Sequence, residues 1–104
     1  MIKVSVLYPN APDVRFDMGY YISKHMPLVR QASGAACKGI EVDQGLAGGA
    51  PDSPATYVAM GHILYESVAA FQAVFAQHGA ALLGDIPNFT NVQPVIQISD
   101  VWKD

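Results

Sequence analysis

The side chain in this sequence best suited to chemistry is that of His25. It lies in a stretch from residue 17 to residue 34 whose apolar residues recur at helical spacing. On a helical wheel its ring falls among Met18, Ile22 and Val29, so we expect it to point toward the core. Burial favours the neutral form of an imidazole, which can accept or donate a proton. A residue of this kind suits general acid–base catalysis.

Two interpretations of His25 are open at this stage. In the first, the ring lines a pocket, because Pro27 cannot donate to the carbonyl of Ser23 and kinks the helix, which opens space beside the ring. In the second, the ring is bonded to a backbone carbonyl and only fills the core. The sequence places no carboxylate near His25, which weakens the case for catalysis.

The tyrosines that precede His25 differ in their expected roles. Tyr21 lies one turn earlier on the same side of the helix, so we expect its phenol to enter the same space and orient a substrate. Tyr20 falls on the opposite side, and we predict that it lies at the surface or in an interface.

The segment from Thr56 to Glu66 could form the opposite wall of a pocket. Its alternation predicts a strand with Ala59 and Gly61 on one face, and small side chains beneath a helix leave volume for a ligand. Close packing of helix on sheet explains the same small residues equally well. The residues on this face that we predict to bind substrate are Ala59, Gly61, Ile63 and Tyr65.

The other reactive groups indicate neither a metal site nor a further catalytic class. No two histidines stand at helical spacing and Cys37 has no partner at ligand spacing, so we expect no metal and no cofactor. Residues 45–49 are rich in glycine but lack the Gly-Lys-Ser/Thr of a phosphate loop. There is no Gly-x-Ser-x-Gly elbow. We predict that His62 faces a partner subunit and that His78 is half exposed.

The composition limits the class of protein. With 104 residues the chain has room for one domain, residues 1–104. Hydrophobic residues make up 51% and charged residues 14%, which excludes disorder. The six Lys and Arg residues are scattered, so nucleic acid is not an expected partner. A single cysteine, no signal-peptide pattern and no apolar run of about 20 residues predict a cytoplasmic protein outside the membrane.

The order of the elements predicts the fold class. Alternating and helical patterns predict strands over residues 1–8, 37–46, 56–66 and 92–101, with helices starting after Asp17 and Ser67. The order βαββαβ is that of a ferredoxin-like α+β domain, a four-stranded antiparallel sheet with two helices on one face. The opposite face would carry apolar residues such as Met60 and Leu64, so we expect a second copy to cover it in a homodimer.

Two motifs resemble one known family. Residues 16–29 read F-D-x-x-Y-Y-x-x-x-H-x-P-L-V, and N-F-T-N follows at residues 88–91 with Pro94 and Gln97-Ile98 close behind. Both are similar to signatures of the EthD-like proteins, and the resemblance covers essentially the whole chain. It implies a dimeric α+β barrel with a ligand between helices and sheet. It also adds Phe89 to the predicted substrate-binding residues and favours a functional His25.

The resemblance implies two different functions. The first is a cofactor-independent enzyme, of the oxygenase or lyase type, acting on a small apolar, oxygenated or aromatic molecule in a catabolic pathway, with His25 and Tyr21 as catalytic residues. The alternative is a non-catalytic dimer that binds a ligand or supports a partner oxygenase, as in ether degradation. A purely structural dimer would have no cavity at all.

Overall fold

The computed structural model describes residues 1–103 and has the predicted order of elements. Its strands are β1 (Ile2–Pro9), β2 (Gly39–Gln44), β3 (Tyr57–Tyr65) and β4 (Val95–Asp100). Its longer helices are α2 (Met26–Ser33) and α3 (Val68–Gly84), and its short helical segments are α1 (Met18–Tyr20), η1 (Tyr21–His25), η2 (Gly34–Ala36) and η3 (Ile86–Asn88).

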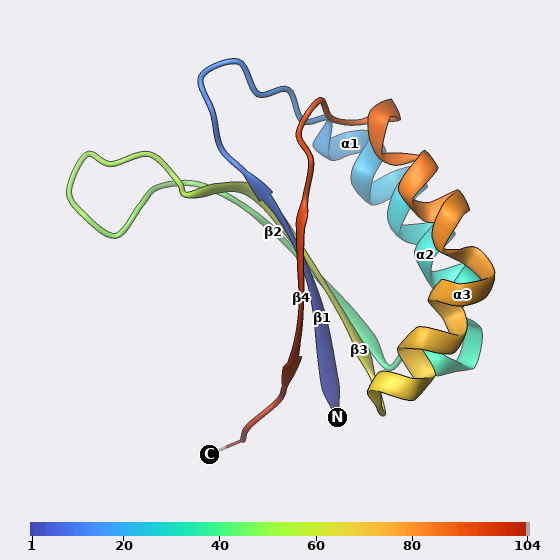
Figure 1. The fold of residues 1–104 in the computed structure, drawn as a ribbon. Coiled ribbons are helices and arrows are strands. Elements are labelled where there is room, and N and C mark those ends of the chain that lie inside the picture. The colour runs from blue at the N-terminus through green and yellow to red at the C-terminus, as the bar shows by residue number, and fades with distance from the viewer. Residues whose placement is uncertain (104) are drawn as a thin grey trace.

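The four strands form one antiparallel sheet in the order β2-β3-β1-β4. The helices form one layer on one side of it, and within residues 1–103 the other side carries no helix (Figure 1). This is the ferredoxin-like arrangement, and the predicted fold class is therefore confirmed.

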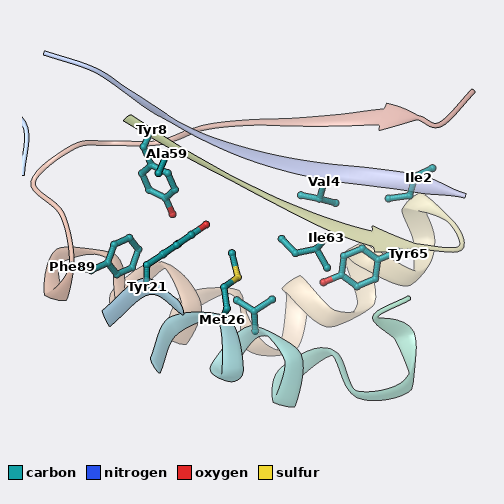
Figure 2. Packing of buried hydrophobic residues seen from close by; sticks show 10 residues of the cluster. Ile2, Val4, Tyr8, Tyr21, Met26, Ala59, Ile63, Tyr65 and Phe89 are labelled. Atoms are coloured by element: carbon teal, nitrogen blue, oxygen red, sulfur yellow. The ribbon is translucent and has the colours of Figure 1, made fainter. Parts of the chain in front are cut away.

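Strand β3 follows the predicted alternation. The side chains that face the helices, among them Ala59 and Ile63, are buried, whereas Met60, His62 and Leu64 point to the bare side and are partly exposed. The facing residues therefore set one wall of the space between sheet and helices. Figure 2 shows Tyr21 and Met26 of the helical layer pointing into this space.

The predicted helix starts are confirmed by their caps. Asp17 accepts a hydrogen bond from the backbone nitrogen of Tyr20 at 3.0 Å, and Ser67 accepts one from Ala70 at 3.1 Å. The last strand begins at Val95 instead of the predicted Val92, since Pro94 has no N–H to donate to a sheet.

The helical stretch at residues 18–33 departs from a regular α-helix at Tyr21–His25, the turn that carries two of the predicted site residues. Residues Tyr21–His25 form a π-helical turn, in which the backbone nitrogen of Met26 donates to the carbonyl of Tyr21. Pro27 follows at the start of α2. A π turn adds a residue to the turn, so it changes which side chains share a helix face.

The bare side of the sheet carries a hydrogen-bonded series across three strands. Ser5 of β1 lies 2.8 Å from Nδ1 of His62 in β3, and Nε2 of His62 lies 3.1 Å from Asp43 of β2. His62 therefore occupies the predicted face, with its ring nitrogens both engaged inside the protomer. Across residues 1–103, no helix is long and apolar enough to span a bilayer.

Candidate functional site

The centre of the candidate site is a carboxylate partner for His25, Asp85, which comes from the C-terminal end of α3. Nδ1 of His25 lies 2.9 Å from Oδ2 of Asp85, the residue that caps the C-terminus of α3. The two side chains are only 7% and 14% exposed. The pair is therefore shielded from bulk water, and the carboxylate fixes the orientation of the ring.

Asp85 collects two further hydrogen bonds. The Tyr20 hydroxyl donates to Oδ1 at 2.7 Å, and the Asn88 amide donates to the same oxygen at 2.9 Å. Burial by itself would raise the pKa of Asp85, but the hydrogen bonds from Asn88, His25 and Tyr20 outweigh it and hold the pKa below the ordinary 3.8. Asp85 is thus a carboxylate at neutral pH, and the Nδ1 atom of His25 carries the proton that it accepts.

This arrangement corrects two predictions. The sequence placed no carboxylate near His25 and put Tyr20 on the opposite side of the helix, and both predictions are wrong. Tyr20 is half-buried, stacks on Phe89 and reaches Asp85. The π turn explains the second error, because it brings residues five apart toward one face, whereas a regular wheel separates them. Asp85 lies 60 residues from His25, a distance over which periodicity carries no signal.

Tyr21 is the most deeply buried aromatic residue of the site. Its ring stacks on that of His25, with centroids 5.5 Å apart and planes 12° apart, and is 0% exposed. Its hydroxyl is buried and faces that of Tyr8, without making a hydrogen bond of good geometry. Burial, with Tyr8 as a smaller cause, raises its pKa, so the phenol stays protonated. Figure 2 shows the hydroxyl groups of Tyr8 and Tyr21 directed toward one another between sheet and helices.

A small cavity adjoins these side chains. It has a volume of about 60 Å³ and lies between the helices and the helix-facing side of the sheet. Four of the predicted site residues line it: Tyr21, His25, Ile63 and Tyr65. Its remaining walls are formed by Tyr8 and by apolar side chains, among them Val4, Val29, Phe71 and Leu82. The space is well below the roughly 300–1,000 Å³ of sites that enclose a drug-sized ligand.

The other three predicted substrate-binding residues lie outside the lining. A Cβ built on Gly61 would stand 2.1 Å from the Tyr21 hydroxyl oxygen and 2.6 Å from Cε of Met26, so close packing takes up the volume expected there. Ala59 is fully buried. Phe89 packs against the rings of His25 and Tyr21, with centroids 4.7 and 5.0 Å away. These three residues therefore pack around the site residues and do not line the cavity.

The donor set around His25 favours acid–base chemistry over metal binding. Within residues 1–103, no group of three or more His, Cys, Asp or Glu side chains gathers as metal ligands do. The Tyr65 hydroxyl is bonded to Ser33 at 2.8 Å and is thus occupied by the fold. Of the cavity-lining residues, His25, Tyr21 and Tyr8 carry the polar groups left for a ligand.

The element order, sheet order and helix-side pocket define a ferredoxin-like α+β protein of the class to which dimeric α+β barrels belong. The model of the EthD domain matches residues 13–93, a span that includes Tyr20, His25 and Asp85. This chain belongs to the EthD family. The resemblance noted in the sequence is thereby confirmed.

Solved structures agree with this assignment. An EthD-like protein from Ralstonia eutropha JMP134 has a TM-score of 0.91 and 45% identity, covering 95% of this chain and 89% of that one. An ethyl tert-butyl ether D family protein from Bacillus halodurans C-125 has a TM-score of 0.74 and 20% identity, covering 98% and 99%. A proposed monooxygenase from Shewanella loihica PV-4 has a TM-score of 0.62 and 14% identity, covering 99% and 95%. No protein of curated function matches the sequence.

Proposed function

We propose that this chain is a homodimeric enzyme in which His25 transfers a proton to or from a small neutral, oxygenated or aromatic substrate. The observation that carries the proposal is the 2.9 Å contact between Nδ1 of His25 and Asp85, made by a ring that also lines an apolar cavity. A positioned imidazole with a carboxylate behind it is a common general base, and it contributes typically about 100- to 10,000-fold in rate.

The two nitrogen atoms of the His25 ring have different roles. Because Asp85 accepts the proton on Nδ1, the lone pair of the neutral ring resides on Nε2. Nε2 removes a proton from substrate in the cavity, and the imidazolium that forms is stabilised by the adjacent carboxylate. Return of the proton to another atom of the intermediate completes the cycle. Tyr20 and Asn88 are positioning residues, because they hold Asp85 and do not line the cavity.

The unpartnered hydroxyl of Tyr21 supports a role in orienting the substrate. A buried hydroxyl without a hydrogen bond costs about 1–3 kcal/mol of stability, so its retention calls for a reason. With its pKa raised, the phenol keeps a proton to donate, and an oxygen atom on the substrate is a suitable acceptor. An oxygenated substrate therefore complements the imidazole of His25 and the phenol of Tyr21.

Proton removal is the first step shared by the two reaction types that we consider. An electron-rich anion formed in this way can react with dioxygen, in an oxygenase, or expel a leaving group, in a lyase. The fold likeness to a proposed monooxygenase from Shewanella loihica PV-4 is compatible with the first type. We propose that no cofactor takes part, since the chain supplies the acid–base group itself.

The homodimer is proposed from the bare side of the sheet. By register, its apolar side chains are Leu7, Val58, Met60, Leu64 and Val95, the last of them 52% exposed. Several polar groups on this face are already paired, as in the series Ser5, His62 and Asp43, whereas Lys3 and Glu41 have no side-chain partner among residues 1–103. Burying this face against a second copy would therefore remove apolar surface from water without orphaning the His62 ring.

Deuterium uptake tests the proton transfer directly. The full chain is incubated in deuterated water with β-tetralone, a neutral aromatic ketone with an exchangeable C–H, and uptake is followed by proton NMR. We expect exchange above the uncatalysed rate, its loss in His25→Gln, and its retention in His78→Gln, a half-buried histidine on α3. Equal exchange by the wild type and His25→Gln would remove His25 from the mechanism. Binding of the ketone without exchange would instead support the ligand-binding, accessory role beside a partner oxygenase.

A further inference from the structure

A second hollow lies just outside the cavity of His25. It is a groove of about 560 Å³ between the end of α3, η3 and the start of β4. Its lining residues are Leu83, Ile86, Pro87, Thr90, Asn91, Val92, Gln93, Pro94 and Ile96. None of these residues bonds to the side chain of His25 or Asp85 in the acid–base site described above.

The groove and the cavity share a wall. Leu83, Ile86 and Ile96 line both, so the two hollows meet at these three side chains. Ile96 pairs with Val6 in the register and thus points to the helix side of the sheet, yet it is 42% exposed. Leu83 at the end of α3 is 43% exposed. Exposed apolar side chains at this junction indicate an opening and not a closed core.

The two volumes limit how a ligand can sit. The cavity, at about 60 Å³, holds no more than a few atoms, whereas the groove, at about 560 Å³, is in the ordinary range of ligand sites. A ligand of usual size must therefore leave most of its body in the groove. Only its tip can pass Leu83 and Ile96 to reach His25.

The chemistry of the walls limits what the ligand can be. Of residues 1–103, those lining the two hollows include no Lys, Arg, Asp or Glu. A charged ligand would lose its hydration there without gaining a counter-charge. The side chains of Asn91 and Thr90 are hydrogen-bonded to backbone groups of Arg15 and Asp13, so they stabilise the loop and are not free for a ligand. Gln93 is the groove's uncommitted polar side chain among the described residues.

We infer that the groove is the entrance and outer half of the substrate site, and that the substrate is a neutral, elongated molecule whose small, uncharged, oxygen-bearing tip is inserted between Leu83 and Ile96 beside His25. The inference rests on the proposed function for the reacting end, and it adds the class of substrate and the residues that select it. Leu83, Ile86 and Ile96 are then specificity-determining residues.

The test uses methyl NMR on the full chain with two probes of similar length, neutral methyl hexyl ketone and anionic octanoate. We expect the ketone to shift the methyl signals of Leu83 and Ile96 together with the ring signals of His25, and to bind more tightly than octanoate. Ile96→Trp should weaken ketone binding about tenfold or more, because its indole fills the junction. Ile98→Trp is the matched control, since Ile98 lies two residues further along the same face, is 39% exposed and lines neither hollow.

The outcomes separate this inference from the proposed function. Shifts of the His25 ring with undiminished binding to Ile96→Trp would overturn the entrance and leave the acid–base proposal standing. Shifts at Leu83 and Ile96 that leave the His25 ring unchanged would mean that the groove does not lead to the cavity, which also overturns it. Tighter binding of octanoate would refute the neutral class. No shift at the groove methyls would mean that the groove is closed to the ketone, as it would be under a second copy, and would overturn it as well.

Discussion

Gly61 and Tyr21 should be energetically coupled, because the Tyr21 hydroxyl occupies the space of a missing side chain. In Gly61→Ala the new Cβ would stand 2.1 Å from the hydroxyl oxygen and 3.3 Å from Cζ of the same ring. The ring cannot easily retreat, since the rings of Phe16 and Phe89 both lie 5.0 Å from it. Cε of Met26 at 2.6 Å is the end of a flexible side chain and can move. We expect Gly61→Ala to cost about 2 kcal/mol.

Tyr21→Phe removes the colliding oxygen and leaves the 3.3 Å contact with Cζ of the ring and the contact with the flexible end of Met26. Since that hydroxyl is buried without a partner, the single variant should be neutral or more stable by about 1 kcal/mol. In the Tyr21→Phe background, Gly61→Ala should then cost less than about 1 kcal/mol, a coupling of about 1–2 kcal/mol.

Urea unfolding of the four proteins at one fixed protein concentration measures this coupling, and the fixed concentration removes the mass-action effect of a dimer. Gly49→Ala is the control, since a Cβ there would meet nothing within 4 Å. Additive effects, with a coupling below about 0.5 kcal/mol, would refute the packing described for Tyr21. A clear loss of stability in Tyr21→Phe alone would show that its hydroxyl has a partner.

Two further predictions concern the acid–base pair and the bare face. Asp85 has a pKa below 3.8 in the fold, so its stabilisation is present above that pH and is lost as the pH falls through the folded pKa. Asp85→Asn should thus have a free energy of unfolding about 1–3 kcal/mol lower than the wild type at neutral pH. Urea titrations at falling pH should show this difference in unfolding free energy shrink as Asp85 is protonated. A difference that stays constant down to low pH would contradict the prediction. Val95→Lys, on the bare face, should elute as a monomer in light-scattering chromatography, whereas Ile22→Lys, 54% exposed on the helical layer, should stay dimeric. Dimeric Val95→Lys would move the interface elsewhere.

Much of the fold follows from local signals in the sequence. The alternation along β3 separates Ala59 and Ile63 from Met60 and Leu64, and the structure buries the first pair as expected. Asp17 and Ser67 mark helix starts because short polar side chains cap free N–H groups. Such signals depend on neighbours in the chain, so periodicity and capping suffice to predict them.

The site was only half predictable for a physical reason. A regular wheel places Tyr21 and His25 together, and they do stack. It separates Tyr20 from His25, because nothing in periodicity announces a π turn. Asp85 depends on how the end of α3 meets the helical stretch at residues 18–33, which is a property of the tertiary fold. Pro27 was the available signal, since it marked residues 21–27 as an irregular part of the helix.

The central claim is that Asp85 holds His25 as the tautomer whose Nε2 can act as a base. Long-range proton–nitrogen NMR of the full chain, at a pH where the ring is neutral, reports which ring nitrogen carries the proton. We expect the His25 proton on Nδ1 in the wild type, and a change of this pattern in Asp85→Asn, which has lost the carboxylate. A neutral His25 with its proton on Nε2 in the wild type would contradict the account, because that nitrogen could not then accept a proton from a substrate.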